Sequence, residues 1–205
     1  MGRKTQKAAK REHEATKPAR RLRDRAPVRY LAPLAKLADQ QPMALLGGGT
    51  LALGMVTRRP AMIRSGARML AAQIVAIGAK SLAKGNVDRL RPDADGAPGL
   101  TKGSGTDDKS RNAFPSGHTA GAVASAEAVA HEVPAAATTA RGLAALAGAL
   151  QVPRGKHYVS DVVAGAAVGW LSERIAGAAI RAIERLAEDR TLSMDAEGEA
   201  EAHPS

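Results

Sequence analysis

Five apolar runs separated by polar loops occupy the central part of the chain. Each run is rich in Ala, Leu, Val and Gly and is long enough for several helical turns, which predicts helices rather than strands; the runs cover residues 43–56, 69–83, 119–133, 140–150 and 162–186. A weaker pattern over residues 30–41 places Leu31, Leu34 and Leu37 on one side and predicts an additional interfacial helix. The pattern therefore predicts an all-α fold, a bundle of about five to six helices.

Hydropathy leaves the surroundings of this bundle open. No run reaches the ~18 to 20 uninterrupted apolar residues of a clear membrane span, and Lys80 and Glu127 interrupt two of them. Small residues recur every three to four positions, which lets helix backbones approach closely, as in membrane bundles. Aromatic residues make up only 2% of the chain, so Ala, Leu, Val, Ile and Gly must form the core. Buried core helices and short membrane spans fit these segments about equally well.

Charge divides the chain into three parts. Of the net charge of +10, residues 1–40 supply +8, with 12 Lys or Arg against 4 Asp or Glu. We predict a disordered basic arm over residues 1–29, a helical domain over residues 30–187 and a disordered acidic tail over residues 188–205. The arm suits a solvated tail, a topology signal beside a membrane or a surface for anionic lipids. Nucleic acid is not favoured as its partner, because no aromatic stacking platform accompanies the charge.

The first polar segment with candidate chemistry follows the second run. It holds Lys84, six further residues, and then Arg91 and Pro92. Phosphate recognition needs fixed cationic donors, for which arginine offers a planar fork and lysine a point charge. Alone, Lys84 fits a lysine that extends to solvent from a helix end, and Arg91 fits a surface arginine. Together they are a candidate phosphate-binding pair.

The second segment, Ser116-Gly117-His118, immediately precedes the third run. At a helix N-terminus the free backbone N–H groups and the helix dipole favour an anion, and Gly117 permits close approach of the backbone. An ordinary turn with an N-cap would also explain Ser116 and Gly117. His118 adds a group that can donate a proton near neutral pH.

The third segment opens the last run with His157 and Asp161, four positions apart and therefore on one helix face. A carboxylate there could hold one imidazole nitrogen and leave the other free to attack phosphorus. A capping or surface pair would have the same spacing. The functional interpretation therefore depends on all three segments occurring in order.

In that order, Lys84-x6-Arg91-Pro92, Pro115-Ser116-Gly117-His118 and Gly155-x-His157-x3-Asp161 resemble the three signature segments of the type 2 phosphatidic acid phosphatase superfamily. The resemblance spans roughly residues 40–180 and is closest to the short bacterial lipid phosphatases. It implies a membrane-embedded helical phosphatase that needs no metal or other cofactor and acts through a phosphohistidine. The implied roles are nucleophile for His157, orienting partner for Asp161, general acid for His118, and phosphate binding for Lys84, Arg91, Ser116 and the Gly117 amide.

One position departs from the resemblance. The third signature segment normally carries an arginine where this chain has Gln151, which can donate a hydrogen bond but has no charge. Arg154 is a candidate substitute from a different backbone position. The departure keeps an alternative open: a catalytically weak or inactive member that acts as a membrane or scaffold protein.

The resemblance also implies partners and a location. A phosphate site at the end of weakly apolar helices suits a lipid phosphate or polyprenyl phosphate, or the corresponding diphosphate, and a multi-pass protein of the bacterial inner membrane. The Gly- and Asp-rich loop 93–112 is the candidate lid or head-group reader. The absence of Cys and of a clustered His/Glu set gives no indication of a metal site.

Overall fold

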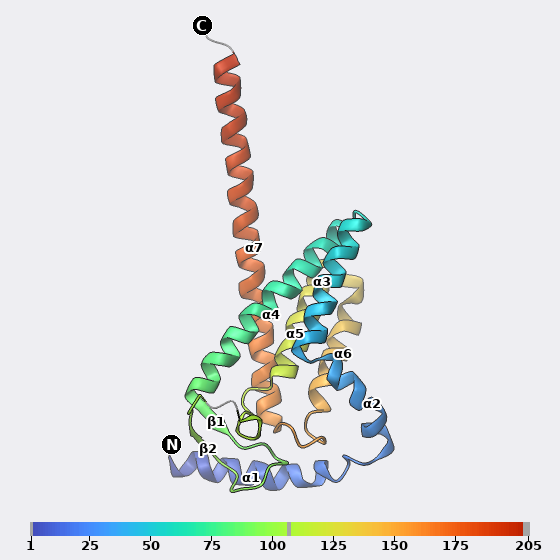
Figure 1. The fold of residues 1–205 in the computed structure, drawn as a ribbon, viewed down its shortest axis with the longest axis vertical. Coiled ribbons are helices and arrows are strands. Elements are labelled where there is room, and N and C mark those ends of the chain that lie inside the picture. Colours follow the sequence, from blue (N-terminus) through green and yellow to red (C-terminus); the bar gives the residue numbers. More distant parts are fainter. Residues whose placement is uncertain (1, 106–107, 203–205) are drawn as a thin grey trace.

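The computed structural model describes residues 2–105 and 108–202, with the backbone alone for residues 192 and 194–202. Within these residues, helices and a short antiparallel hairpin alternate with loops (Figure 1). The elements are α1 (Arg3–Arg20), α2 (Ala26–Leu37), α3 (Gln40–Val56), α4 (Pro60–Asn86), β1 (Val87–Arg89), β2 (Leu100–Lys102), η1 (Lys109–Arg111), α5 (Gly117–Glu132), η2 (Pro134–Ala136), α6 (Ala137–Ala149) and α7 (Val159–Ala202).

The all-α prediction is confirmed: the five predicted runs coincide with α3 to α7, except that Val133 and Leu150 lie one residue beyond the ends of α5 and α6. The hairpin was not predicted. It pairs Val87 with Lys102 and Arg89 with Leu100, directly after α4. Strands of three residues are too short to show an alternating pattern in the sequence. Loop 93–112 therefore contains β2 and η1.

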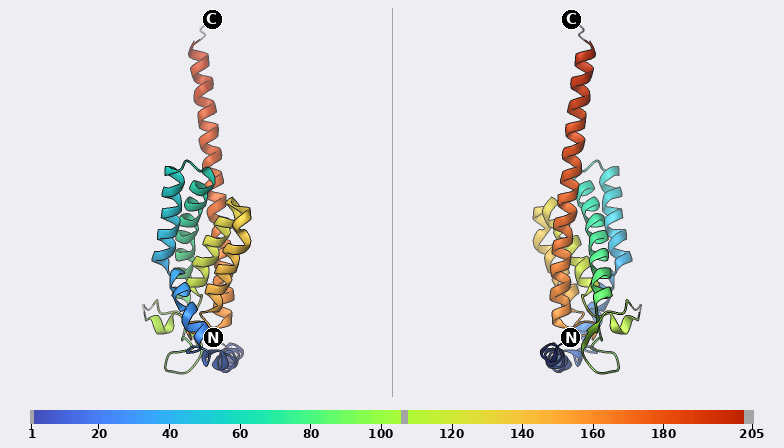
Figure 2. Two further views of the ribbon diagram at one scale, coloured as in Figure 1. Left: turned by 90° about the vertical axis from the view of Figure 1, so that its right-hand side faces the viewer. Right: turned by 90° about the vertical axis from the view of Figure 1, so that its left-hand side faces the viewer.

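Helices α3 to α7 form the bundle, with α3 packed on α4 and α5 packed on α4, α6 and α7 (Figures 1 and 2). Its buried apolar side chains are mostly alanines, in two clusters that include Ala122, Ala126 and Ala147, and Ala72 and Ala124. Such small side chains let helix axes approach closely, which compensates for the shortage of aromatic residues.

Two glycines mark the closest helix contacts. A Cβ on Gly66 of α4 would lie 2.4 Å from the Leu51 nitrogen of α3, and one on Gly169 of α7 would collide with the Ala120 carbonyl of α5. Any larger residue would push these helices apart. These contacts set the positions of the α4 C-terminus and of the α5 and α7 N-termini, which lie at the same end of the bundle (Figure 1).

The predicted disordered basic arm is instead the helix α1, which corrects the sequence-based expectation. It lies across the end of the bundle where α5 and α7 begin (Figures 1 and 2). Polar contacts hold it there: the Gln6 side chain donates to the Leu100 carbonyl at 2.6 Å, and His13 Nδ1 lies 3.1 Å from the Tyr158 hydroxyl. The prediction was wrong because α1 docks through hydrogen bonds, which hydrophobic periodicity does not reveal.

The predicted disordered acidic tail is also helical, up to Ala202 of α7, and residues 203–205 lie outside the described part. Beyond the bundle this helix extends without neighbours in Figure 1, and the side chains of residues 181–191 are all exposed. Ala, Leu, Glu and Arg dominate this stretch and favour a helix even without packing. A high charge content therefore did not imply disorder.

The expected membrane spans find no support in the helices. Within residues 2–105 and 108–202, none combines the length and the apolar character needed to cross a bilayer.

Candidate active site

Backbone hydrogen bonds hold the three polar segments together at one end of the bundle. The Ala113 nitrogen donates to the Arg89 carbonyl at 3.0 Å, which joins the segment after α4 to the segment before α5. The Asp93 nitrogen donates to the Gly155 carbonyl at 3.0 Å, and Lys156 Nζ lies 2.8 Å from Asp93 Oδ2, which joins the first segment to the third. Residues far apart in the sequence are thus fixed around one small volume.

His157 lies at the centre of this arrangement and is 2% exposed. Its Nδ1 lies 2.7 Å from the carbonyl oxygen of Ala113. A carbonyl can only accept, so Nδ1 carries the proton and Nε2 carries the lone pair. Burial lowers the pKa of His157 to about 3, against an opposing effect of the Ala113 hydrogen bond. The side chain is therefore neutral at pH 7, as a nucleophile must be.

Asp161 is fully buried and lies near His157 without holding it directly. Its Oδ2 is 3.9 Å from His157 Nδ1 but accepts a hydrogen bond from the Tyr158 nitrogen at 2.8 Å. Its Oδ1 accepts from Arg89 Nη1 at 2.5 Å. Burial raises the pKa of Asp161 to about 6, and Arg89 opposes that rise. The expected direct contact with the imidazole is thus replaced by the backbone of Ala113.

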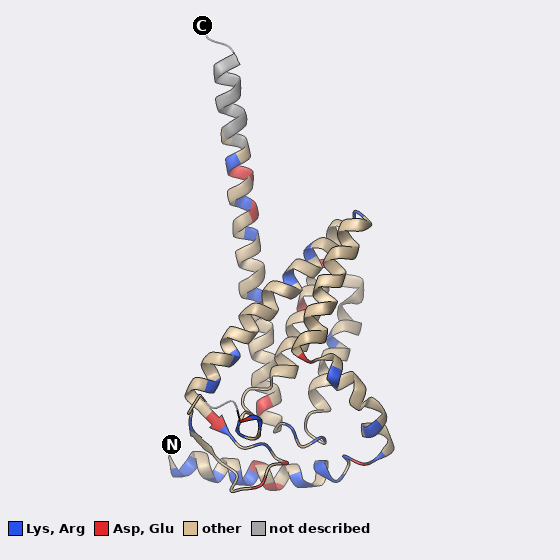
Figure 3. Ribbon diagram, viewed as in Figure 1, with Lys and Arg blue, Asp and Glu red and all other residues tan. Residues whose placement is uncertain are grey.

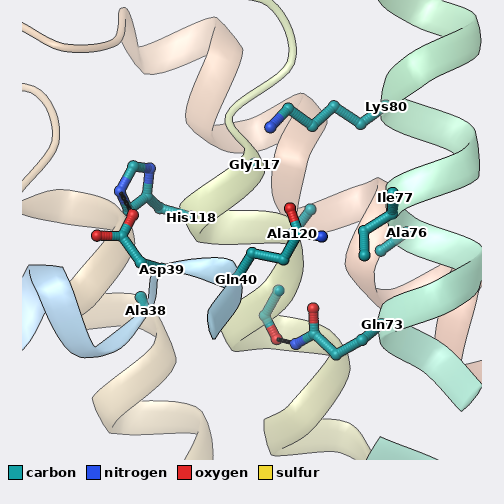
Figure 4. Close-up of a pocket in the computed structure, with 11 residues that line it drawn as sticks. Ala38, Asp39, Gln40, Gln73, Ala76, Ile77, Lys80, Gly117, His118 and Ala120 are labelled. Carbon is teal, nitrogen blue, oxygen red and sulfur yellow. Dashed lines mark hydrogen bonds and ion pairs between the residues drawn. The ribbon is translucent and has the colours of Figure 1, made fainter. Parts of the chain in front are cut away.

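His118 faces His157 with the two ring centroids 6.2 Å apart. Its Nε2 lies 2.5 Å from Oδ1 of Asp39, which belongs to the turn between α2 and α3 (Figure 4). Burial is the main cause that lowers the pKa of His118; Asp39 raises it, and the cations Arg154, Lys80 and Arg91 lower it further. His118 therefore lies within the field of three cations that come from separate segments.

Two of these cations, Arg91 and Arg154, carry buried polar atoms that lack a partner. Arg91 Nε and Arg154 Nη1 have no hydrogen-bond partner among the described residues. Buried guanidinium groups are normally satisfied, so these two fit an anion from outside the chain. Burial also lowers the pKa of Arg91. Phosphate binding by Arg91 and Arg154 remains the sequence-based prediction, and both side chains lie near His118.

Lys80 is a site residue that the sequence analysis treated only as an interruption of an apolar run. Its side chain extends from α4 toward Gly117 (Figure 4), and a Cβ on Gly117 would lie 2.8 Å from Lys80 Nζ. Burial, then Lys84 and Arg91, lower the pKa of Lys80. Lys84 is half-buried one turn further along α4. The spacing of four between these lysines was the available signal, because it places both on one helix face.

Ser116 starts helix α5 rather than lining an open surface. It is fully buried, and its Oγ accepts from the Thr119 nitrogen at 3.4 Å and from the Thr119 hydroxyl at 2.9 Å. Its backbone nitrogen donates to the Asp161 carbonyl at 3.0 Å. Ser116 thus joins the starts of α5 and α7, in the N-cap role that the sequence also allowed.

Gln151 lies in the position of the missing arginine. It is fully buried; its Nε2 donates to the Ala147 carbonyl at 3.2 Å, and its Oε1 has no partner in the described part of the chain. Its backbone carbonyl accepts from the His157 nitrogen at 3.3 Å. The residue supports the loop before α7, while Arg154 supplies the charge near His118.

A cavity of about 170 Å³ opens beside His118, Lys80 and Gly117 (Figure 4). Asp39, Gln73 and Gln40 also line it; His157 is not among its lining residues, but the centroid of its ring lies 6.2 Å from that of His118. An apolar groove of about 610 Å³ adjoins this cavity, and Ala38 lines both. The groove lies between α2, α3, α5 and α6 and includes Leu34, Leu37, Met43, Leu46 and Leu143. In the described residues no three His, Asp or Glu side chains form a potential metal site.

Comparison with known proteins identifies the family and structures of similar fold. The family model of the PAP2 superfamily matches residues 65–183, and the chain belongs to this superfamily. No curated protein matches the chain. The crystal structure of Aquifex aeolicus LpxE is similar, with a TM-score of 0.56, 19% identity, and coverage of 80% of this chain and 92% of that one. A transmembrane PAP2-type phosphatidylglycerolphosphate phosphatase from Bacillus subtilis aligns with a TM-score of 0.56 at 18% identity, over 85% of this chain and 86% of that one.

Proposed function

We propose that this chain is a phosphatase that removes the phosphate group of a lipid or polyprenyl phosphate through a phosphohistidine on His157. The observation that carries the proposal is the state of His157: neutral, with Nδ1 bound to Ala113, beside a second histidine and the cations Arg91 and Lys80. Nε2 would attack phosphorus while the bond from phosphorus to the leaving oxygen breaks. His118, in its protonated form, would donate its proton to that oxygen.

The second half of the reaction would use the same groups in reverse. Neutral His118 would take a proton from water, whose oxygen attacks the phosphohistidine and releases inorganic phosphate and neutral His157. Arg91, Arg154 and Lys80 would stabilise the charge on the phosphoryl oxygens, with Lys84 at the rim and the Gly117 amide at the helix N-terminus. Water is the only co-reactant of these steps, and none of them is assigned to a metal.

The apolar groove supports a substrate with a hydrocarbon chain. Because it shares Ala38 with the cavity beside His118, a single molecule could place its phosphate in the cavity and its chain in the groove. The PAP2 membership and the resemblance in fold to the two phosphatases above support the same substrate class. Such a substrate resides in a bilayer, so the proposal includes association with a membrane, in a bacterium the inner membrane.

Gln151 favours one alternative, a weak or inactive member that serves as a membrane or scaffold protein. Its buried side chain provides no charge to the site. Loss of one charge-assisted hydrogen bond costs on the order of 1.5–3 kcal/mol, which predicts a slower enzyme rather than an inactive one.

The test is phosphate release from a panel of lipid and polyprenyl phosphates in detergent with EDTA, comparing the native chain with His157→Ala. We expect release that survives EDTA and is lost entirely in the variant, and acid-labile, base-stable phosphate on the native protein alone. Release that persists in His157→Ala would overturn the assignment of the nucleophile. No release from any substrate would favour the inactive alternative.

A further inference from the structure

Arg89 contacts both groups that surround His157 Nδ1, although none of the three sequence segments assigned it a role. Its side chain is 4% exposed and donates from Nη1 to Asp161 Oδ1 at 2.5 Å. Its backbone carbonyl accepts from the Ala113 nitrogen at 3.0 Å, and the carbonyl of Ala113 in turn holds His157 Nδ1 at 2.7 Å. One residue of β1 thus fixes the hydrogen-bond acceptor of His157 and the neighbouring carboxylate.

Glu12 of helix α1 holds the other side of the Arg89 guanidinium. Its Oε2 accepts from Arg89 Nη2 at 2.6 Å and from the Ser160 hydroxyl at 2.9 Å, while its Oε1 accepts from the Ser160 nitrogen at 2.9 Å. Arg89 Nη1 also donates to the Ser160 hydroxyl at 2.6 Å. Glu12 thereby binds the first turn of α7, the turn that carries Asp161, even though 148 residues separate it from Ser160.

Aromatic packing closes the same network. The Arg89 guanidinium lies 4.1 Å from the ring centroid of Tyr158, the residue after His157, and His13 of α1 lies against the hydroxyl of that ring. A guanidinium fixed by two carboxylates, a hydroxyl and an aromatic face has little freedom to move. Burial opposes ionisation of Glu12, but the Ser160 amide and Arg89 bring its pKa below the usual value, so Glu12 is charged at neutral pH.

We propose that Arg89 and Glu12 are positioning residues, and that helix α1 is an integral part of the active site that they hold to His157. The proposal rests on the proposed function and goes beyond it, because it assigns a role to the basic N-terminal segment. In this arrangement α1 fixes Arg89 through Glu12, Arg89 fixes Ala113 and Asp161, and these fix the tautomer and orientation of the nucleophile. Neither residue touches the reacting atoms.

The decisive variant is Glu12→Gln in the full chain. It keeps the size and part of the hydrogen bonding of Glu12 but removes the charge that holds Arg89. Because a misplacement of about 1 Å can cost a reaction about 100-fold, we expect kcat to fall on the order of tenfold for an aryl phosphate and a polyprenyl phosphate alike. KM should change less than about twofold, because the cations that bind phosphate are untouched.

Glu14→Gln is the matched control. It makes the same chemical change two residues further along α1, where Glu14 is exposed and pairs with Lys17 at 2.7 Å. Its kcat should equal that of the native chain. Arg89→Lys retains the charge, but a lysine cannot reach Asp161, Ser160 and Glu12 together, so this variant should lower kcat. The double variant Arg89→Lys/Glu12→Gln should have a kcat only slightly below that of Arg89→Lys, because both substitutions disrupt the same contact.

A second measurement is independent of activity. In ¹⁵N-histidine NMR spectra, His157 of the native chain should show the tautomer with the proton on Nδ1, and Glu12→Gln should increase the Nε2-protonated population. The proposal would be overturned if Glu12→Gln changed neither kcat nor the spectrum, or if it raised kcat. It would also be overturned if the loss of activity in Glu12→Gln equalled the fraction of the protein that is unfolded at the assay temperature. If the native chain releases no phosphate, the proposed function fails, and the spectra alone decide whether Glu12 positions His157.

Discussion

Two buried arginines of this chain make nearly the same contacts in different places. Arg89 binds Asp161 and Glu12 at the end of the bundle that carries the histidines, whereas Arg68 of α4 binds Glu173 of α7 and lies 3.6 Å from Glu132 at the end of α5. Both arginine side chains are 4% exposed, and each faces two acids from two other elements. Burial and pairing therefore do not distinguish them.

Their neighbours do distinguish them. The Arg68 cluster pairs its charges within itself: Arg64 Nε binds Glu132 at 2.7 Å, and Gly177 leaves room for the Arg68 guanidinium on α7. At the other end, the carboxylates that Arg89 binds adjoin a histidine, and nearby arginine atoms lack partners. Figure 3 shows many charged residues on α1 and the adjoining loops, and mostly uncharged residues along the bundle helices. A cluster whose charges pair with one another indicates a structural role, whereas a surplus of positive charge indicates a binding site for an anion.

Among the variants that test this difference between the two clusters, Arg68→Met should have the largest effect. It leaves Glu173 buried without its main partner, so we expect a loss of about 3–5 kcal/mol in the free energy of unfolding. The kcat of the fraction that remains folded should not change. Denaturant titration combined with active-site-normalised kinetics measures both quantities.

Two further variants keep this prediction testable. Arg64→Met, at a side chain 51% exposed, should change the free energy of unfolding much less than Arg68→Met, because solvent screens an exposed ion pair. Should Arg68→Met not fold, Arg68→Lys preserves the charge and should show a smaller loss of the same kind. A fall in kcat of folded Arg68 variants as large as that of Glu12→Gln would mean that the two clusters do not differ in role.

His118→Ala tests whether His118 acts as the general acid of the proposed reaction. A general acid matters most when the leaving oxygen is a poor leaving group, so alkyl and polyprenyl phosphates should lose about 100-fold in kcat while an activated aryl phosphate loses much less. Rates for a series of leaving groups of different pKa measure this dependence. Equal losses on every substrate would contradict the role of His118 and indicate that it only binds phosphate.

How much the sequence could predict differs between these regions for a physical reason. The helices of the bundle and residues such as Arg91, His118 and His157 are visible because local periodicity and short motifs encode them. The contacts of Arg89 with Glu12 and of His118 with Asp39 join residues separated by long stretches of chain, and no local pattern marks them. Helix α1 was misread for this reason: its docking uses a few polar contacts that only the fold brings together.

The smallest expected effect concerns Asp39, whose carboxylate lies 2.5 Å from His118 Nε2. Among the groups that face His118, Asp39 raises its pKa, whereas burial and the cations Arg154, Lys80 and Arg91 lower it below its ordinary value of 6.5. The proposed mechanism needs protonated His118, so the native kcat/KM should decline with rising pH, with a midpoint below 6.5. The pKa of His157 is about 3, so His157, the proposed nucleophile, remains neutral across that range.

Asp39→Asn removes the group that, among the described residues, stabilises the imidazolium form of His118, and the pKa of His118 must therefore fall further. The decline of kcat/KM should move to lower pH, while Glu188→Gln, the same charge change on the exposed part of α7, should leave it in place. Bound phosphate supplies negative charge beside His118 and so raises the pKa of His118 in the enzyme–substrate complex. The decline of kcat should therefore occur at higher pH than the decline of kcat/KM. A shift to higher pH in Asp39→Asn would show that the decline belongs to another group, and the surplus of cations at this end would then act on phosphate binding alone.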